Sequence, residues 1–410
     1  MKTIKDSVHD HIEVDGVARA LLDTPEVQRL RHITQLGTAS LVYPSANHTR
    51  FEHSLGVYHN ACEALDHLGI EGENAEKVRA AAILHDVGHG PFSHNLEPLT
   101  HRRTGKYHDD VHELFERGTI GEVLREHDIA PHEVADLVAG DGQYGQIVSG
   151  ELDVDRMDYL VRDAHHTGVP YGTIDHARLL RELTFDDDGE LVLDEGNVQT
   201  AESLLVARAL MTPTVYGHHV ARISKAMLRQ AGERLLDTTE TSAGELRRMD
   251  DHDLLSTLRN TETTAELARR FDHRDLFKRA VWAEYDDVPD HLLAAEHEDI
   301  RGWELEIADE AGVDVGEVIL DVPGDPSMQE SSTRVLVNGE ARRLDEQSPL
   351  VQALQSAQQA QWRLGVYAPA EATDQVRSAV VRTLDIEESA LVSEVGAGLH
   401  ATLDQFAEGA

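Results

Sequence analysis

The segment with the clearest chemical potential is residues 83–94. Here His85 and Asp86 close an apolar helical stretch, and a Gly/Pro turn returns two more imidazoles, His89 and His94. Imidazole and carboxylate groups are ordinary ligands of Mn, Fe, Co, Ni and Zn, and carboxylates also suit Mg. The chain has 25 histidines, so a His-Asp pair alone carries little weight. Its position at the end of an apolar helix is what predicts a divalent metal site.

The spacing of His85 and His89 also occurs in zinc proteases, where both histidines lie on one uninterrupted helix and a glutamate follows the first. Here Asp86 stands in place of that glutamate, and Gly88 and Pro91 end the helix. A zinc-protease site is therefore set aside.

Three motifs resemble those of a known enzyme family. They are residues 50–57 (RFEHSLGV), 83–94 (ILHDVGHGPFSH) and 152–159 (LDVDRMDY), in this order. They resemble the HD-domain metal-dependent phosphohydrolases. More narrowly, they resemble the deoxynucleoside triphosphate triphosphohydrolase branch, which includes the animal SAM-and-HD-domain enzyme. The similarity runs from Met1 to about residue 280, and we expect no SAM domain ahead of it.

The resemblance implies a metal-ligand set of His53, His85, Asp86 and Asp155. We expect these ligands to converge from three helices. The ion would be divalent, and its identity stays open among Mn, Mg, Fe, Ni, Co and Zn. Taken alone, His53 fits a core histidine as well as a ligand.

The predicted helix around Asp155 has a polar face of its own. Asp155, Tyr159, Asp163 and His166 follow one another at helical spacing, opposite an apolar face. A solvated surface is the alternative interpretation. A tyrosine and a histidine among the acids favour a face that lines a cleft.

The resemblance also implies three further histidines near the metal, His89, His94 and His108. Phosphoester hydrolysis needs a general acid for the leaving 5′-oxygen, and imidazole titrates near neutral pH. The family has a His–Glu pair where His108 is followed by Asp109. A pair of surface histidines, His108 and His112, remains the alternative.

Seven positions match the substrate contacts of the family: Gln35, Arg50, Arg156, Tyr159, Asp163, Arg208 and Tyr216. The arginines would hold the triphosphate, because guanidinium binds phosphate with two hydrogen bonds. Gln35 and Asp163 match residues that bind the sugar 3′-hydroxyl, and Tyr159 matches a residue against the sugar. Tyr216 matches an aromatic residue that crowds the 2′ position and favours deoxyribose. A surface Arg208 and a core Tyr216 are the alternatives.

Lys2, Asp23, Gln28 and Arg31 resemble the family's regulatory nucleotide site, which would bind GTP or dGTP between subunits. His219 departs from that pattern, as does Lys5. Salt-bridged surface residues are the competing interpretation. The family also implies a homodimer or a homotetramer.

The fold must bring these candidate site residues together. We expect a mainly α fold, with an HD-domain helical core and a smaller C-terminal mixed α/β lobe. We expect an HD phosphohydrolase core over 1–240, a helical connecting region over 241–300 and the α/β lobe over 301–410. The pattern predicts helices over 25–36, 53–68, 75–87, 150–166, 198–210, 217–236, 348–361 and 372–383, short extended pieces before residue 15, and strands over 318–320, 334–337 and 364–367.

Composition limits the class of protein. The formal charge is 37 − 76 = −39, and only six of the 37 basic residues are lysine, which resembles the proteins of salt-loving archaea. This charge argues against nucleic-acid binding, which relies on clustered Lys and Arg. We find no apolar run long enough to span a membrane, and with Cys62 alone no intrachain disulfide forms. We expect a cytoplasmic protein.

The leading hypothesis is metal-dependent hydrolysis of deoxynucleoside triphosphates to deoxynucleoside and tripolyphosphate. An HD phosphohydrolase acting on another nucleotide, a monophosphate or a signalling nucleotide, is the alternative within the enzyme class. A nucleotide-sensing or single-strand-binding protein with a vestigial site is the alternative outside it.

Overall fold

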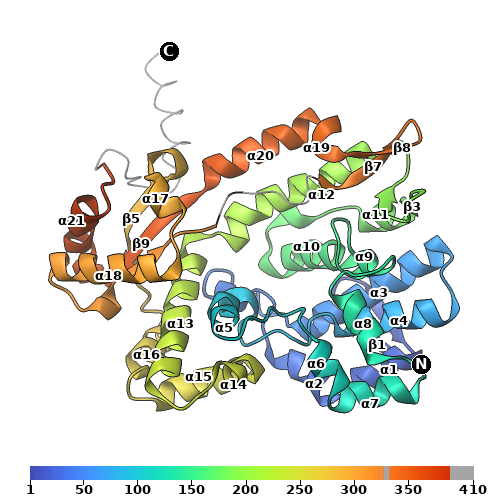
Figure 1. Cartoon of the computed structure of the whole chain (residues 1–410), viewed down its shortest axis with the longest axis horizontal. Coiled ribbons are helices and arrows are strands. Elements are labelled where there is room, and N and C mark those ends of the chain that lie inside the picture. Colours follow the sequence, from blue (N-terminus) through green and yellow to red (C-terminus); the bar gives the residue numbers. More distant parts are fainter. Residues whose placement is uncertain (325, 327–331, 388–410) are drawn as a thin grey trace. The chain divides into compact units, whose positions relative to one another are not determined.

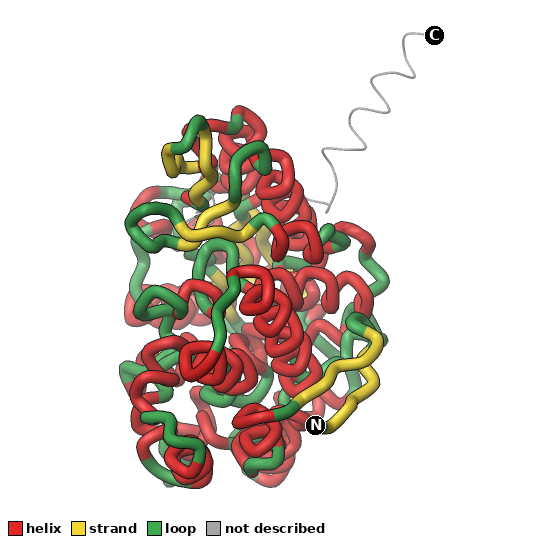
Figure 2. The backbone as a smooth tube through the Cα atoms, turned by 90° about the vertical axis from the view of Figure 1, so that its right-hand side faces the viewer, coloured by secondary structure: helices red, strands yellow, loops and turns green. Residues whose placement is uncertain are grey.

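The computed structural model describes residues 1–324, 326 and 332–387. Helices make up most of this backbone (Figures 1 and 2), which confirms the mainly α fold. Among the described residues, no helix combines the length and the apolar character that crossing a membrane requires.

The described chain forms two compact units. The first comprises residues 1–274 and 332–354, and the second comprises residues 275–324 and 355–387 together with residue 326. The three-part domain division expected from the sequence stays a prediction.

The first unit begins with a β-hairpin. Strand β1 (Lys2–Asp6) pairs antiparallel with β2 (Asp10–Val14), with Ile4 opposite Ile12. Helix α1 (Gly16–Leu22) follows and buries its apolar face. The short extended pieces expected here are confirmed.

The helix predicted from Pro25 to residue 36 is wrong in its length. Helix α2 covers only Pro25–Arg29. The chain then turns and pairs with the segment before the next helix, since Gln35 N–H donates to His48 O at 3.0 Å and Arg50 N–H donates to Ile33 O at 2.9 Å. These long-range backbone bonds outweigh the local helical pattern.

Two helices carry the first two motifs. Helix α3 (Arg50–Leu68) starts with a capping box of Thr49 and Glu52. Helix α4 (Gly72–Leu84) packs against it and ends one residue before His85. The predicted ligand pair therefore lies in the turn after α4 rather than in its last turn.

Three helical segments form the other side of the site. Helix α10 (Val154–Thr167) is capped by Asp153. Helix α12 (Val198–Met211) continues into a π-helical turn over Thr212–Tyr216, and α13 (His219–Thr238) follows. Such π turns are rare and frequently lie at functional sites.

Shorter helices complete the first unit: α5 (Glu97–Thr104), α6 (His112–Glu116), α7 (Thr119–Glu126), α8 (Pro131–Val138), α9 (Gly145–Val148), α11 (His176–Arg181), α14 (Ala243–Arg248), α15 (Asp251–Asn260), α16 (Ala265–Asp272) and α19 (Leu344–Gln347). A four-stranded sheet of order β3-β4-β7-β8 lies in the same unit, formed by β3 (Leu183–Phe185), β4 (Leu191–Leu193), β7 (Arg334–Val337) and β8 (Glu340–Arg343). The predicted strand at 334–337 thus belongs to this unit, because β7 pairs with β4.

The second unit is a small α/β lobe. Its antiparallel sheet has the order β5-β9-β6, from β5 (Lys278–Glu284), β9 (Arg363–Ala368) and β6 (Ile319–Asp321). Helices α18 (His297–Ala311) and α21 (Thr373–Thr383) pack with it around one apolar core. Helix α17 (Asp290–Leu293) also belongs to this unit. In helix α20 (Pro349–Gln361), residues up to 354 belong to the first unit and the rest to the second. A helical connecting region was expected over 241–300; within it, residues 278–284 form strand β5, because they pair with β9.

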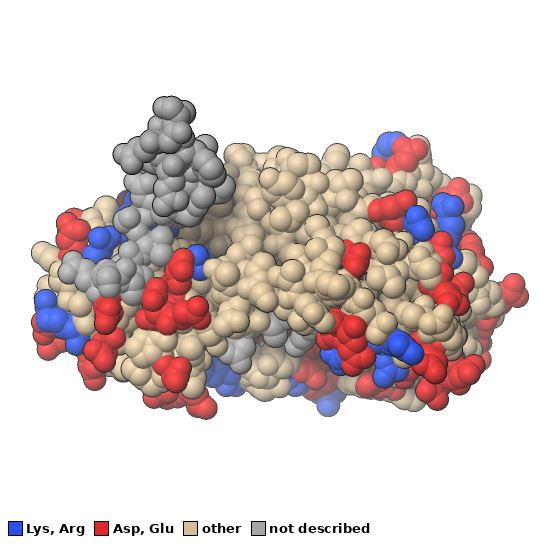
Figure 3. Space-filling model, turned by 90° about the horizontal axis from the view of Figure 1, so that it is seen from above, with Lys and Arg blue, Asp and Glu red and all other residues tan. Residues whose placement is uncertain are grey.

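The surface shows how the charge is distributed. On the face in Figure 3, acidic side chains lie among basic ones, next to broad uncharged areas. Many basic side chains are paired with acids, as in Arg259–Asp272 at 2.6 Å and Lys106–Glu113 at 2.7 Å.

Candidate metal centre and substrate cavity

Four side chains from three helical segments meet at the candidate metal centre. His53 Nε2 lies 2.8 Å from Asp155 Oδ1 and 3.3 Å from His85 Nε2. Asp86 approaches both imidazoles, at 3.8 Å from His53 Nε2 and 3.4 Å from His85 Nε2. The structure thus brings together all four residues predicted as ligands.

Hydrogen bonds on the far side of each imidazole fix which nitrogen faces the cluster. His53 Nδ1 donates to Asp158 Oδ2 at 2.8 Å. His85 Nδ1 donates to the carbonyl of Ala82 at 2.9 Å. Both Nε2 atoms therefore point toward the carboxylates, as they do in metal sites where outer groups orient histidine ligands.

The residues present fit a divalent cation. Asp86 Oδ2 is buried and has no hydrogen-bond partner among the described residues, while its Oδ1 accepts from Arg50 Nη1 at 2.6 Å. A buried carboxylate oxygen without a partner is costly unless a cation satisfies it. His53, His85 and Asp86 lie close enough together to hold one ion, and Asp155 Oδ1 lies 2.8 Å from His53 Nε2, so the set is consistent with binding of a divalent metal.

Electrostatics at the centre favour positive charge. Burial opposes a charged His53, but hydrogen bonds to Asp155 and Asp158 outweigh it and raise the pKa of His53 to about 10. Burial also opposes the ionised Asp86, yet Arg50 and His85 hold the pKa of this carboxyl well below its usual range. The carboxylates thus stay charged and stabilise a cation between them.

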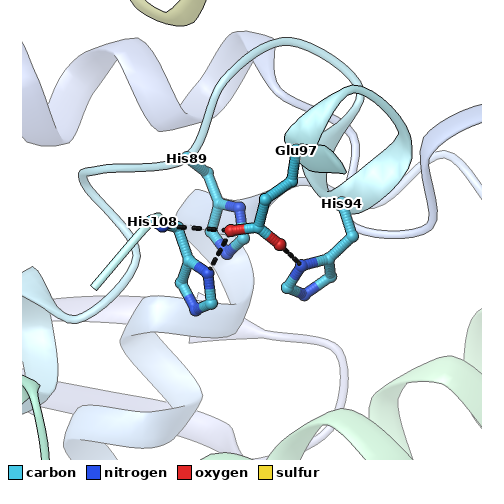
Figure 4. Close-up of side chains that lie close together, drawn as sticks. All are labelled: His89, His94, Glu97 and His108. Atoms are coloured by element: carbon cyan, nitrogen blue, oxygen red, sulfur yellow. Dashed lines mark hydrogen bonds and ion pairs between the residues drawn. The ribbon is translucent and has the colours of Figure 1, made fainter. Parts of the chain in front are cut away.

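A second cluster lies beside the first (Figure 4). Glu97 Oε2 accepts from His94 Nδ1 at 2.7 Å, and its Oε1 accepts from His108 Nδ1 at 2.6 Å and from His108 N–H at 3.0 Å. His89 stacks on His108 with 4.1 Å between ring centroids. His89 Nε2 lies 3.2 Å from Asp86, which joins the two clusters.

The Glu97 carboxylate shifts the pKa values of the histidines that it bonds. Burial disfavours its ionised form, but the bonds from His108 and His94 hold the pKa of Glu97 well below its usual range. Burial would also lower the pKa of His108, and Glu97 outweighs it and raises that pKa. The His94 side chain is partly open to solvent, and desolvation where it meets the protein outweighs its bond to Glu97, so its pKa is lowered. His108 thus belongs to the site, whereas His112 is an exposed residue bonded to Asp136.

The loop that carries these histidines is held in an unusual conformation. Phe92 and Ser93 have backbone φ angles of 56° and 57°, values that residues other than glycine rarely adopt. Asp251 accepts from Phe92 N–H at 2.6 Å and from Thr34 N–H at 3.0 Å. Ser93 Oγ accepts from Arg50 Nε at 2.7 Å. Such strain persists only where neighbours enforce it, and it is concentrated at functional sites.

A cavity of about 410 Å³ opens next to the metal ligands. Eight predicted site residues line it: Gln35, Arg50, His94, Asp155, Tyr159, Asp163, Arg208 and Tyr216. Leu36, Ala39, Val215 and Ala221 supply apolar wall. Pockets for small molecules combine an apolar wall with a few convergent polar groups in this way.

Arg156 is the predicted substrate residue that the structure does not bring to the cavity. It is not among the residues that line this space, and its Nη1 donates to the carbonyls of Gly150 and Glu151. Asp153 lies 3.9 Å from its guanidinium. Arg50 and Arg208 are therefore the arginines that face the cavity.

The four residues of the predicted regulatory site form two pairs on the surface. Lys2 Nζ lies 3.0 Å from Asp23 Oδ1, and Arg31 Nε donates to Gln28 Oε1 at 2.8 Å. Gln28 in turn donates to Leu22 O at 2.7 Å, next to Asp23. Both pairs are compatible with the surface interpretation and with a nucleotide site.

Sequence reasoning missed several residues of the site. Asp158 lies within the third motif but was not assigned a role, and Glu97 lies three residues after His94 on no recognised motif. His48 donates to Asp163 Oδ1 at 2.9 Å, and Lys225 lines the cavity. The spacing of Asp158 from Asp155 was a usable signal; Lys225 had none.

A larger and more open hollow of about 700 Å³ lies elsewhere in the first unit. Residues 186–190 (DDDGE) and Asp141 line it. Such an acidic surface repels phosphate groups, so the cavity at Asp155 is the better nucleotide site.

Comparison with known proteins agrees with these observations. Residues 50–163 match the family model of the HD domain, and residues 174–394 match that of the HD associated region. An uncharacterized protein of Methanocaldococcus jannaschii is 35% identical over 96% of this chain and 86% of its own length. The human deoxynucleoside triphosphate triphosphohydrolase SAMHD1 is 30% identical over 60% of this chain but only 46% of its own length.

Solved structures show the same fold. A hypothetical protein from Aquifex aeolicus superposes with a TM-score of 0.74 at 28% identity, covering 92% of this chain and 99% of the other. A phosphohydrolase from Bacteroides thetaiotaomicron superposes with a TM-score of 0.70 at 26% identity, covering 90% of this chain and 100% of the other.

Proposed function

This chain belongs to the HD-domain phosphohydrolase family with an HD-associated region, and from that premise we propose that it hydrolyses deoxynucleoside triphosphates to deoxynucleoside and tripolyphosphate. One observation carries the proposal. A single cavity is lined by the metal-centre residue Asp155, two arginines and the sugar-contact candidates Gln35 and Tyr216. A substrate that carries both phosphate and deoxyribose matches this set of groups.

The arginines and the metal centre bind the phosphates. Arg50 and Arg208 face the cavity and offer guanidinium groups to phosphate oxygens. A divalent ion held by the cluster of His53, His85, Asp86 and Asp155 supplies Lewis acidity toward a phosphoryl oxygen when bound. Arg50 also bonds Asp86, so it couples phosphate binding to the position of a ligand.

His94 acts on the leaving group in this proposal. It lines the cavity, and Glu97 holds its Nδ1, which leaves Nε2 to exchange a proton with the substrate. Glu97 stabilises the imidazolium form of His94 and orients its ring, as a carboxylate does for the histidine of a catalytic triad. As water adds to the α-phosphorus, the bond from phosphorus to the 5′-oxygen breaks, and the imidazolium of His94 donates its Nε2 proton to that oxygen.

A second candidate function is supported by Arg156. This arginine is bound to backbone carbonyls and to Asp153, so the cavity has one phosphate contact fewer than a triphosphate site of the family. Hydrolysis of a nucleotide with fewer phosphates, a monophosphate or a signalling nucleotide, is therefore the alternative.

Phosphorus NMR distinguishes the two. Protein in molar KCl with Mn²⁺ or Mg²⁺ is given each dNTP, with the Asp155→Ala variant as the inactive control. Tripolyphosphate as the phosphorus product supports the triphosphohydrolase. Orthophosphate or pyrophosphate, or activity only on other nucleotides, supports the alternative. Full activity of Asp155→Ala overturns the assignment of the metal centre.

We further propose that the surface pairs Lys2–Asp23 and Gln28–Arg31 bind GTP or dGTP as an activator, at an interface of a homodimer or homotetramer. The supporting observation is that the Gln28 side chain donates to the carbonyl of Leu22, the residue before Asp23, so the two pairs are neighbours. Adding GTP to the NMR assay tests this directly: activation that Arg31→Ala abolishes supports it, and rates independent of GTP contradict it.

A further inference from the structure

We infer that Asp158 is a positioning residue for the metal ligand His53, and that the N-terminal hairpin β1–β2 helps to hold it in place. The inference deepens the proposed function and rests on its metal centre. It gives the hairpin a role in metal binding that is separate from the surface pairs considered above.

Asp158 is the hub of a buried network in the first unit. Its Oδ2 accepts from His53 Nδ1 and from Arg162 Nε, both at 2.8 Å. Its Oδ1 accepts from His9 Nε2 at 2.7 Å and from Arg162 Nη2 at 3.0 Å. The side chains of Asp158 and Arg162 are fully buried. Four donors on two oxygens leave the carboxylate no freedom to turn away from His53.

The hairpin supplies the outer part of this network. Asp6, at the end of β1, binds Arg162, with 2.9 Å between Asp6 Oδ2 and Arg162 Nη1. Asp6 Oδ1 also accepts from the N–H groups of Val8 and His9, at 2.9 and 2.8 Å. The turn between the strands therefore presents His9 to Asp158 and anchors Arg162 at the same time.

Helix α3 leaves room for the network at Gly56. A Cβ atom at Gly56 would lie 1.9 Å from Asp158 Oδ1 and 2.5 Å from Arg162 Nη2. Glycine costs a helix interior about 1 kcal/mol relative to alanine. The close approach accounts for a glycine at this point, one turn after His53.

This network fixes which nitrogen of the His53 ring faces the metal centre. Because Asp158 accepts the Nδ1 proton, Nε2 is the nitrogen of His53 that faces Asp86 and Asp155, and a bound ion would replace its proton. Outer-shell groups of this kind typically change metal affinity by about 10- to 100-fold when they are removed. Arg162 in turn fixes Asp158, and Asp6 fixes Arg162.

Three variants separate a positioning role from a purely structural one. Asp158→Asn removes the charge at the hub. Asp6→Asn keeps an oxygen for the Val8 and His9 amides but loses the bond to Arg162 Nη1. Asp10→Asn is the matched control, because Asp10 lies on the same hairpin, is exposed and pairs only with other exposed side chains of the hairpin among the described contacts.

The measurement is the affinity of metal-free protein for Mn²⁺ alone, from the EPR signal of free Mn²⁺, with circular dichroism melting as the check on folding. We expect Asp158→Asn to weaken Mn²⁺ binding about 10- to 100-fold, Asp6→Asn to weaken it by less, and Asp10→Asn to match wild type. Where Asp158→Asn does not fold, Asp6→Asn decides.

Wild-type affinity in folded Asp158→Asn and Asp6→Asn overturns the inference. Equal weakening in Asp10→Asn also overturns it, because any change in the hairpin would then suffice. A wild-type protein that binds Mn²⁺ but hydrolyses no dNTP refutes the proposed substrate, while weakened binding in the variants still supports positioning. A wild-type protein that binds no Mn²⁺ overturns both.

Discussion

The Tyr216 hydroxyl donates a hydrogen bond of 2.9 Å to Asp163 Oδ2 at the wall of the cavity. The other oxygen of Asp163 accepts from His48 Nε2, also at 2.9 Å, so the carboxylate is held from both sides. Burial and then the charge of Asp163 raise the pKa of Tyr216 well above its usual value. The phenol therefore stays a donor, and its ring forms a rigid part of the wall.

Removing this ring is expected to relax the choice of sugar. In Tyr216→Ala, space opens where the 2′-hydroxyl of a ribonucleotide would lie, and the dNTP to NTP ratio of kcat/KM should fall by about 10- to 100-fold. Tyr216→Phe keeps the ring and serves as the control, since it loses only the bond to Asp163. An unchanged ratio in Tyr216→Ala would refute the role of this residue in sugar selection.

Replacing Glu97 is expected to slow the chemical step. Glu97→Gln loses the charge that stabilises the imidazolium of His94, and kcat should fall by about 10²- to 10⁴-fold with little change in KM. His112→Ala is the control, because His112 is exposed and bonds Asp136 instead. Steady-state kinetics on the preferred nucleotide measure both. A rise in KM at constant kcat would assign Glu97 to binding.

Stability is expected to decline in mild acid through His166. Burial, followed by the neighbouring His48, lowers the pKa of His166 to about 4, whereas an unfolded histidine titrates near ~6.5. Between these values the unfolded chain binds more protons, so the free energy of unfolding falls as pH decreases from about 6.5 to about 4.

The His166→Phe variant tests this dependence. Phenylalanine retains a ring to stack on His48, which lies 4.4 Å from His166 between centroids. The decrease in Tm over that pH range should be smaller than in wild type. His11→Phe, at an exposed position, is the control. The same decrease in all three proteins would show that other groups cause it.

Adding one methyl group at Gly56 is expected to destabilise the first unit. The new Cβ would overlap Asp158 Oδ1, and a forced shift in a packed core typically costs about 1–3 kcal/mol. In Gly244→Ala, on α14, the Cβ meets no atom of the described chain within 4 Å, so this control should gain up to about 1 kcal/mol from helix propensity. Urea unfolding measures both. Equal stability of the two variants would contradict a tight approach at Gly56.

Much of the metal centre could be expected from the sequence. Residue type at the end of an apolar helix suggested His85 and Asp86, and the resemblance to the HD-domain family implied His53 and Asp155 as their partners. The structure brings the four together and adds Asp158 behind His53.

Other parts could not be expected from local patterns. The helix predicted over 25–36 ends at Arg29 because Gln35 pairs with His48, and no local pattern shows such a bond. Arg156 matches a phosphate contact by position, yet its guanidinium binds the carbonyls of Gly150 and Glu151. Strand β5 was missed because its partner β9 is distant in sequence.

The sequence by itself determined the family through three short motifs, and that resemblance implied the candidate ligands; the mainly helical fold followed from apolar residues at helical spacing. Tertiary structure decided which groups face one another: Glu97 between His94 and His108, Asp163 between His48 and Tyr216, and Arg50 on Asp86. Such contacts join residues from different segments, and their geometry follows from how helices pack rather than from any one helix. The proton positions and charges that catalysis would use are therefore properties of the folded chain.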